Sequence, residues 1–560
     1  MTKALLTAAV ALLAALGALG AAAPQNPFES ASAPTAETPI DRLVFGKLQQ
    51  LGLQPANLCS DAVFVRRVYL DVIGTLPTAQ EAKDFIQDAS LTKRHDLIER
   101  LLARDEFADY WAMKWSDLLR VKAEFPINLW PNAAQSYYRW IRTCIKENKP
   151  YDQFVREMLL ANGSCFRVPQ VNFYRAMQNK EPSGIAQAVA LTFMGARADK
   201  WPKDRLTGMA AFFSQIGYKS TGEWKEEIVS FDLVKEAPIV PSTAPAASPP
   251  KPAAVAPKPA ASATKPAPVA PQVAAVTPQA AVFPDGAPAR LTPGQDPREA
   301  FANWLITQKN PWFARNISNR AWFWLVGRGI IHEADDIRPD NPPVNPELLA
   351  YLEKELVGAR YDLKHLFRLI LNSKTYQLSS IPKTRRPEGA ANFAQYPLRR
   401  LEAEVLIDAL DQITGTTEKY SSAIPEPFTF IPEDVRSIAL PDGSITSSFL
   451  EMFGRPSRDT GMESERNSRP TADQRLHLLN SSHIQRKIEQ GPKLRSLLQS
   501  KEPSREIVNK IYLTVLSRYP TEEELQIVGA YPQSGGGKGG TVTIDLVWAL
   551  VNSAEFLYRH

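Results

Sequence analysis

Apolar residues recur along most of this chain at spacings of three and four, the period of an α-helix buried on one side. One such stripe begins after Asp362, a residue type that caps helix starts, and comprises Leu363, Leu366, Phe367 and Ile370. Prolines at short intervals divide the pattern into short segments. The chain is therefore predicted to be mainly all-α, with two irregular multi-helix lobes, a small β element and a disordered insertion rich in alanine and proline.

A helix–turn–helix phrase occurs near both ends of the chain. The first copy comprises residues 68–72 (VYLDV) and 77–81 (PTAQE), and the second comprises residues 511–515 (IYLTV) and 520–524 (PTEEE). Each copy contains Thr-x-x-Glu, a capping box in which the Thr hydroxyl and the Glu carboxylate accept free backbone N–H groups at a helix start. A second echo, Leu-x-x-x-x-Glu-Phe, ends at Phe107 and again at Phe556. The repeat predicts the same helix–turn–helix structure at both ends of the chain and gives no indication of a chemical reaction.

The region between the two halves has a different composition. Residues 242–282 contain no acidic residue and are dominated by proline and alanine. Such a sequence cannot bury a core and is expected to be extended and disordered. The chain is therefore divided into a signal peptide (1–22), an N-terminal helical domain (38–236), a linker (237–281) and a C-terminal helical domain (282–560). The flanking residues 227–232 and 281–284 are predicted as short strands, and we expect them to pair with each other across the insertion.

The amino terminus has the pattern of a secretory signal peptide. Lys3 precedes an apolar run over residues 4–20, and the small residues that follow predict cleavage near Ala22. A retained membrane anchor is the alternative, because a run of this length is at the lower edge of a membrane span. No other stretch approaches a span. The protein is therefore predicted to be exported to the periplasm or cell surface, with no transmembrane span after cleavage.

The net charge limits the kinds of partner that the protein is expected to bind. The whole chain has a formal net charge of +5, which is weak for 560 residues. A weak charge and an exported destination together exclude nucleic acid as a partner.

Only three cysteines are present, Cys59, Cys144 and Cys165. They allow at most one internal disulfide, with one thiol left over. A chain of this length can bury cores without such a bond. The favoured interpretation is three buried packing residues, and a single disulfide is the alternative.

Several ordered phrases carry a family resemblance. In the N-terminal half they are Arg66-Arg67-Val68-Tyr69-Leu70-Asp71, Gly74-x-x-Pro77-Thr78, Trp111-Ala112-x-x-Trp115-x-Asp117-Leu118-Leu119-Arg120 and Ala210-Ala211-Phe212-Phe213. In the C-terminal half they are Asp296-Pro297-Arg298, Asn310-Pro311, Asn319-Arg320-x-Trp322, Gly327-Arg328-Gly329, Asp335-Asp336, Ser373-x-Thr375-Tyr376-Gln377 and Arg399-Arg400-Leu401-x-x-Glu404. The chain resembles the two-domain, planctomycete-type proteins that carry domains of unknown function 1549 (N-terminal) and 1553 (C-terminal). The resemblance covers nearly the whole mature chain outside the linker, and it implies an exported helical protein without an established activity.

One departure from the relatives bears on cofactors. Many relatives carry Cys-x-x-Cys-His just before the Ala-Phe-Phe segment, or a fused cytochrome-like domain, which implies covalent haem. The corresponding residues 195–203 contain no cysteine and no histidine, and the motif occurs nowhere in this chain. A covalent c-type haem is excluded because no sulfur is available for its thioether bonds. A redox role survives only as an accessory to a separate haem-bearing partner.

A loop rich in carboxylates is the candidate metal site. Its acidic residues are Glu333, Asp335, Asp336 and Asp340. Ca²⁺ takes six or more oxygen ligands, several of which such a loop can supply, although the spacing is not that of an EF-hand. The favoured alternative is helix capping together with ion pairs to Arg328 and Arg338.

Arginines cluster in a loop-like stretch of the C-terminal half. They are Arg455, Arg458, Arg466, Arg469 and Arg475. Guanidinium groups bind carboxylate, sulfate and phosphate in two-point geometry, so an anionic polysaccharide is a candidate ligand. The favoured alternative is internal pairing with one helical face, which comprises Arg400, Glu404, Asp408 and Asp411.

Other catalytic signals are weak. The sequence contains neither a Gly-x-Ser-x-Gly elbow nor a Gly-x-x-x-x-Gly-Lys loop. His477 and His483 are six residues apart, which predicts opposite faces of a helix and no shared metal. Three tryptophans could form a sugar-stacking platform but are expected in the core because of their helical spacing: Trp312, Trp322 and Trp324.

The favoured function is a non-catalytic, exported binding or scaffold protein for an anionic glycan or an exported partner protein. The alternatives are an extracytoplasmic metal-assisted enzyme acting on polysaccharide, and an accessory to a haem-bearing redox partner. The positions of the acidic loop and of the arginine-rich stretch discriminate between the first two. Convergence in one cleft with unpaired carboxylates favours the enzyme, whereas mutually satisfied groups favour binding.

Overall fold

The computed structural model describes residues 26–30, 33–235, 280–292, 294–500, 502–534 and 540–560. The predicted signal peptide and almost all of the predicted linker lie outside these ranges.

Helices dominate both halves of the described chain. The first half contains α2 (Pro39–Gln50), α3 (Asp61–Val72), α4 (Ala79–Gln87), α5 (Lys93–Ala103), α6 (Asp105–Leu118), α7 (Pro131–Lys146), α8 (Tyr151–Leu159), α9 (Asn172–Arg175), α10 (Pro182–Val189) and α11 (Lys203–Ala210). The second half contains α12 (Pro297–Leu305), α13 (Phe313–Val326), α14 (Pro346–Gly358), α15 (Leu363–Asn372), α16 (Pro387–Ala391), α17 (Ala403–Thr414), α18 (Ser448–Met452), α19 (Ala472–Asn480), α20 (Ser482–Gln490), α21 (Pro492–Leu498), α22 (Ser504–Leu516), α23 (Glu522–Ala530), α24 (Gly540–Val551) and α25 (Ala554–Leu557). The predicted all-α class is confirmed. Among the described residues, none of the helices is both long enough and apolar enough to cross a bilayer.

Two small antiparallel sheets accompany the helices. Their strands are β1 (Gly163–Ser164), β2 (Ile216–Ser220) and β3 (Glu227–Phe231) in the order β1-β3-β2, and β4 (Arg399–Arg400) paired with β5 (Tyr558–Arg559). The expected pairing of residues 227–232 with 281–284 is wrong. Both edges of β3 are occupied by β1 and β2, so no edge remains for the later segment. Val282 instead bridges to Pro288 and donates its N–H to the carbonyl of Gly208.

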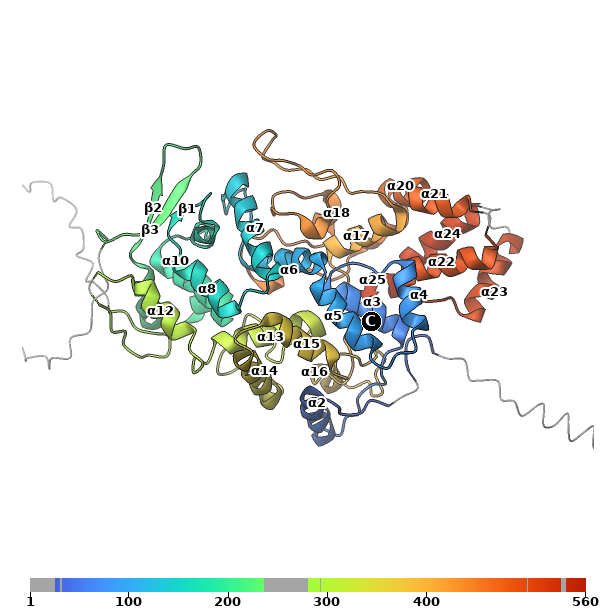
Figure 1. Cartoon of the computed structure of the whole chain (residues 1–560), viewed down its shortest axis with the longest axis horizontal. Coiled ribbons are helices and arrows are strands. Elements are labelled where there is room, and N and C mark those ends of the chain that lie inside the picture. Colours follow the sequence, from blue (N-terminus) through green and yellow to red (C-terminus); the bar gives the residue numbers. More distant parts are fainter. Residues whose placement is uncertain (1–25, 31–32, 236–279, 293, 501, 535–539) are drawn as a thin grey trace, which may run out of the picture.

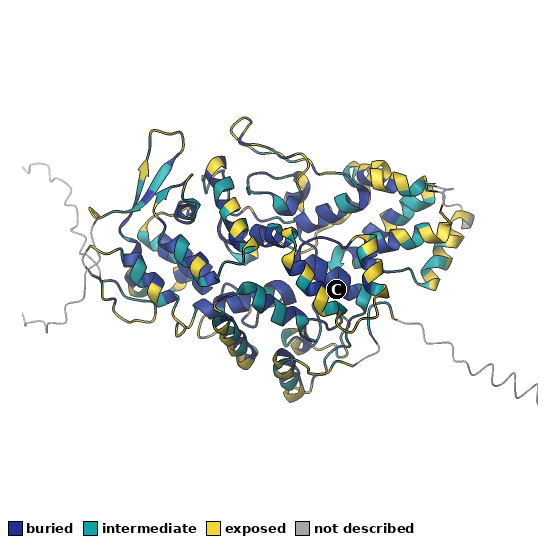
Figure 2. Ribbon diagram, viewed as in Figure 1, coloured by how far each residue is buried: buried dark blue, intermediate teal, exposed yellow. Residues whose placement is uncertain are grey.

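The two halves share one core. Figure 1 shows an elongated molecule with β1–β3 at one end and α22–α24 at the other. Buried apolar side chains form a continuous cluster that runs from α2 to α25. Trp111 of α6 and Trp324 of α13 meet inside it with ring centroids 5.2 Å apart. Figure 2 shows that burial is deepest in this central region, whereas α22–α24 present more exposed residues.

Buried ion pairs also connect the halves. Arg559 of β5 lies 3.3 Å from Asp71 of α3 and 2.5 Å from Glu402. Glu402 also accepts Lys114 of α6 at 2.5 Å. All four groups are buried and have lost their contact with water. Each charge is therefore stabilised mainly by its oppositely charged partner.

The repeated phrase forms the same local structure twice. It corresponds to α3–α4 and to α22–α23, and both predicted capping boxes are present, at Thr78 with Glu81 and at Thr521 with Glu524. The predicted cap at Asp362 is confirmed as well, because it accepts the N–H of His365 at the start of α15.

The residues expected in the core lie there. Trp322 and Trp324 are buried, and Trp312 is partly buried with its ring 5.8 Å from Trp304. Cys59, Cys144 and Cys165 are free and buried.

Candidate functional site

The arginine-rich stretch lies against the centre of the molecule. Arg466 donates to Asp117 of α6 and to Glu404 of α17, with N–O distances of 2.6 Å to each. Arg458 donates to Asp117 at 2.9 Å, and Arg455 lies 3.5 Å from Glu404. Three of the five candidate anion-binding arginines therefore bind carboxylates of this chain.

These groups stabilise one another's charged forms. Burial alone raises the pKa of Glu404, but the charge and hydrogen bonds of Arg466 outweigh burial and hold that pKa below its usual value. For Arg466, burial lowers the pKa, and the charges of Asp117 and Glu404 raise it well above its usual value. Arg469 and Arg475 are exposed and form no ion pair within the described part of the chain.

Each carboxylate of the acidic loop has an arginine partner. The pairs are Glu333–Arg197 (3.3 Å), Asp335–Arg320, Asp336–Arg338 (3.1 Å) and Asp340–Arg338 (3.0 Å). Arg338 was expected from the sequence. Arg328, also expected, forms no ion pair in the described ranges, and Arg197 and Arg320 take part instead. In the described ranges, no three His, Cys, Asp or Glu side chains are grouped in a way that suits a metal ion. The Ca²⁺ hypothesis therefore gains no geometric support.

The acidic loop and the arginine-rich stretch adjoin each other. The carboxylate of Asp335 accepts the backbone N–H of Glu463 at 2.6 Å. A cleft of about 270 Å³ opens beside this junction. Asp459, Thr460 and Met462 of the arginine-rich stretch form one wall, and residues of the N-terminal half form the rest. The two regions therefore converge, but their carboxylates are already paired.

Arg120 is the buried cation of this cleft. Arg120 is only 4% exposed, and its Nε donates to the carbonyl of Thr460 at 3.0 Å. Its Nη1 has no hydrogen-bond partner, and no carboxylate forms an ion pair with it, as far as the described residues show. Burial lowers the pKa of Arg120 to about 10, so it remains protonated at neutral pH. The charges of Glu465 and Asp335 act on Arg120, but neither carboxylate forms an ion pair with it in the described ranges. A buried charge without a directly paired counter-ion is costly, so an anion from solvent would be a favourable partner.

Local backbone geometry holds Arg120 in this position. It follows the end of α6 in a left-handed conformation, with φ of 57°. The loop that covers it approaches closely at Gly461, where a Cβ atom would lie 2.7 Å from the guanidinium carbon of Arg120. A larger residue at Gly461 would displace this arginine.

Arg197 is a second cation in the same cleft. Its Nη2 lies 3.3 Å from Glu333, and its buried Nε has no hydrogen-bond partner among the described residues. Two acidic residues also line the cleft, but Asp459 pairs with Lys122 at 2.8 Å and Asp199 is exposed. Two arginines therefore line the cleft, and each has one buried donor without a hydrogen-bond partner among the described residues.

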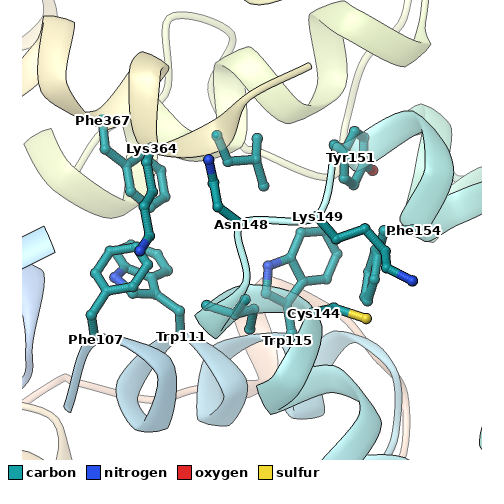
Figure 3. A pocket seen from close by; sticks show the side chains of 12 residues that line it. Phe107, Trp111, Trp115, Cys144, Asn148, Lys149, Tyr151, Phe154, Lys364 and Phe367 are labelled. Atoms are coloured by element: carbon teal, nitrogen blue, oxygen red, sulfur yellow. The ribbon is translucent and has the colours of Figure 1, made fainter. Parts of the chain in front are cut away.

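An aromatic cavity lies elsewhere, between α6, α8 and α15 (Figure 3). Trp111, Trp115, Tyr151 and Phe367 line it, and Lys364 extends over the ring of Phe107 with its ammonium 4.9 Å from the ring centroid. The cavity holds only about 40 Å³, whereas a cavity that binds benzene is on the order of 150 Å³. It is therefore a packing defect of the core, too small for an organic ligand without rearrangement.

A wider cleft of about 880 Å³ lies between α4 and α6 on one side and α17 on the other. Asp408 of α17 lines it and accepts the backbone N–H groups of Ser437 and Ile438 at 2.7 and 3.1 Å. Burial raises the pKa of Asp408 to about 7. A carboxyl group that titrates near neutrality suits general acid–base chemistry, but its two hydrogen bonds also fix the chain after Arg436.

Family models match both halves of the chain. Residues 39–217 match the family PSCyt2, a protein of unknown function (DUF1549), and residues 297–531 match the family PSD1, a protein of unknown function (DUF1553). The chain therefore contains both domains, one in each half. Searches of curated proteins and of solved structures gave no match. The cleft at Arg120 lies where these two domains meet, since Arg120 and Arg197 belong to the PSCyt2 domain and residues 459–462 belong to the PSD1 domain.

The histidine pair corrects one prediction for this PSCyt2–PSD1 protein. His477 and His483 do not lie on opposite faces of one helix, because the chain bends between α19 and α20 at Ser481, whose backbone is extended. Their ring nitrogens are 3.3 Å apart, and the far nitrogen of His483 lies 3.0 Å from Glu418.

Sequence reasoning missed the two cations of the PSCyt2–PSD1 cleft. Arg120 ends one of the family phrases, directly after the apolar pair Leu118-Leu119, which was the only available signal of a buried arginine. Arg197 lies in residues 195–203, the stretch without cysteine or histidine. Neither position reveals in sequence that Asp117, three residues before Arg120, is already bound by other arginines.

Proposed function

We propose that this protein is an exported, non-catalytic binding protein for an anionic glycan or an anionic partner protein. The observation that carries the proposal is Arg120, a buried guanidinium without a carboxylate partner in the described structure, which lines a cleft beside Arg197. A carboxylate, sulfate or phosphate group of the ligand would supply the missing counter-ion.

The geometry of the cleft predicts how ligand binding should depend on salt. Arg120 is held by its bond to Thr460 and by the close approach of Gly461, so its donors are oriented before the ligand arrives. Arg197 is partly exposed and must share its charge with Glu333. We therefore expect binding to weaken with salt, chiefly through the exposed part of the site.

The enzyme alternative has one supporting observation. Asp408 lines the wide cleft with a pKa near neutrality, which would suit a general acid acting on a polysaccharide. A metal-assisted form has less support, because the carboxylates of the acidic loop are engaged by arginines. The role as an accessory to a haem-bearing partner rests on the family resemblance alone.

The test of the anion site is a thermal melt of the mature protein with inorganic sulfate, inorganic phosphate, and sulfated and uronic polysaccharides. Each ligand is measured at low and high salt, with and without Ca²⁺. We expect a salt-sensitive rise in Tm that is lost in Arg120→Gln and in Arg197→Gln. Arg475→Gln is the matched control, because it removes an exposed arginine outside the cleft.

Three outcomes are informative. Loss of the rise in both cleft variants supports the site. Loss in Arg475→Gln, with binding retained in both cleft variants, moves the site to the exposed arginines. Turnover of any polysaccharide that disappears in Asp408→Asn would replace the binding proposal by the enzyme alternative.

Export is tested separately. The amino terminus of protein recovered from the cell envelope or medium should begin just after Ala22. A protein that retains Met1 and sediments with membranes would establish the retained anchor instead.

A further inference from the structure

Three aromatic side chains from separate segments meet at the surface. They are Trp130 at the start of α7, Trp224 in the turn between β2 and β3, and Phe428 in the segment between α17 and α18. The ring centroids of Trp130 and Trp224 are 6.3 Å apart at an angle of 79°, and those of Trp130 and Phe428 are 5.9 Å apart at 59°. These three rings, called here the aromatic corner, form adjoining walls rather than one flat face.

The aromatic corner is open to solvent. Trp224 is 67% exposed and Phe428 is 52% exposed, which is unusual for side chains of this size. Two more exposed rings, Phe125 and Phe430, belong to the same two loops as Trp130 and Phe428. An exposed concentration of aromatic surface on three separate loops indicates a recognition surface.

A cation accompanies the rings. The ammonium of Lys225 lies 5.2 Å from the ring centroid of Trp130 and 5.3 Å from that of Trp224. Lys225 forms no ion pair with any carboxylate in the described ranges, and it adopts a left-handed backbone with φ of 60°. The turn therefore places an unpaired positive charge directly beside two ring faces.

We propose that the aromatic corner binds an acidic sugar, either a uronic acid or a sulfated pyranose, within a polysaccharide chain. The apolar C–H face of the pyranose would stack on Trp224 or Trp130, and the carboxylate or sulfate would pair with Lys225. The surface is distinct from the cleft at Arg120, so this inference goes beyond the proposed anion site and does not depend on it.

The combination of groups favours a sugar over a protein partner. The exposed rings of Trp224 and Phe428 occur together with the unpaired ammonium of Lys225, so the corner combines apolar ring faces with one positive charge. Sugars present alternating apolar C–H faces and polar edges, which match rings set at angles with a charged group between them. The charge of Lys225 selects an anionic sugar over a neutral one.

The test is a fluorescence and calorimetric titration of the full mature protein with a short oligogalacturonate, a sulfated oligosaccharide and a neutral malto-oligosaccharide. In Trp224→Ala we expect the Kd for the acidic sugars to rise at least about tenfold, with loss of most of the tryptophan fluorescence change. Lys225→Gln should reduce the preference for acidic over neutral sugars. Trp548→Ala is the control, because Trp548 is an exposed tryptophan of α24 far along the chain.

Every result decides for or against the inference. Unchanged affinity in both Trp224→Ala and Phe428→Ala overturns it, as does a corner that responds equally to neutral and acidic sugars. If Trp224→Ala instead abolishes self-association in sedimentation, the corner is a contact between two copies. Binding of inorganic sulfate that needs Arg120 but not Trp224 would leave the anion site standing even if the corner binds no sugar.

Discussion

Arg104 and Arg518 occupy the same structural place in the two copies of the internal repeat, although they come from different positions in the repeated sequence. Each binds the glutamate of a capping box and the glutamate of the second echo: Glu81 and Glu106 for Arg104, and Glu524 and Glu555 for Arg518. Arg104 immediately precedes α6, whereas Arg518 follows α22. The repeat therefore preserves an Arg–Glu–Glu cluster while exchanging the segment that supplies the cation.

The tyrosine of each repeated phrase completes the cluster. The guanidinium carbon of Arg104 lies 5.7 Å from the ring centroid of Tyr69, and that of Arg518 lies 5.4 Å from Tyr512. The guanidinium group of each arginine therefore contacts a ring with its face and two carboxylates with its edge, and both kinds of contact stabilise its charge. The conserved element of the repeat is thus a charge cluster that fixes two helices at a turn.

Replacing Arg518 with methionine should destabilise the protein, because two neighbouring carboxylates would lose their shared cation. We expect a loss of about 2–3 kcal/mol in the free energy of unfolding, below the value for a fully buried pair because the glutamates retain some exposure. Chemical denaturation measures it. The matched control is Arg505→Met in α22, the helix that Arg518 follows. The pair of Arg505 with Glu522 is exposed and should contribute no more than about 0.5 kcal/mol. Equal losses in the two variants would show that Arg518 contributes only a surface pair.

Arg466 is expected to act on stability rather than directly on ligand binding. Its removal in Arg466→Met leaves Asp117 and Glu404 buried without their main counter-ion. We expect a loss of about 3–5 kcal/mol, measured by chemical denaturation. Arg475→Met, at an exposed position of the same stretch, should change stability by no more than about 0.5 kcal/mol. Near-wild-type stability of Arg466→Met would mean that this arginine is free to serve a ligand.

Local sequence signals predicted the local structure of this protein. Capping boxes at Thr78 and Thr521 and the cap at Asp362 depend on residues within one turn of the helix they start, so a short window contains all the information. The pairing of residues 227–232 with 281–284 failed because strand partners are chosen among all available edges. Residues 216–220, which directly precede that strand in the sequence, occupy one of its edges, and the more distant residues 163–164 occupy the other.

The candidate sites show the same limit. An arginine can be recognised in sequence as an anion-binding group, but its availability depends on which carboxylates reach it from elsewhere. Arg466 and Arg458 both donate hydrogen bonds to Asp117, which lies more than three hundred residues earlier in the chain. Arg120 forms no ion pair among the described residues, because Glu465 and Asp335, whose charges act on it, are bound by Thr460 and Arg320 respectively. Availability is therefore a property of the packed structure.

The cysteines give a prediction about reactivity. Burial raises the pKa of Cys144 to about 12 and also raises that of Cys165, so neither forms a reactive thiolate near neutral pH. A thiol reagent at neutral pH should label no cysteine in the native protein and all three after denaturation. The reduced and non-reduced proteins should also have the same mass. Labelling of only one thiol after denaturation without reductant, or a mass two hydrogens lower before reduction, would restore the disulfide alternative.

Asp408 should make stability depend on pH near neutrality. Burial raises its pKa to about 7 in the folded state, against an ordinary value of 3.8, so the folded protein binds this proton more tightly than the unfolded chain. Its contribution to stability is fully present below the unfolded pKa and is lost as the pH rises through 7. The full difference is on the order of 4 kcal/mol.

Asp408→Asn removes this titration while keeping one acceptor for the backbone N–H groups of Ser437 and Ile438. Arg436 and Asp411 are the charged groups that act on Asp408 in the folded state, and they remain in the variant. Chemical denaturation at pH 5 and pH 8 should show that the wild type loses more stability than Asp408→Asn as the pH rises. Other groups titrate in both proteins, so the difference between the two profiles isolates Asp408. Parallel profiles would mean that the carboxylate stays ionised across this range, held by its two backbone donors and by Arg436, and the argument for Asp408 as a general acid would end there.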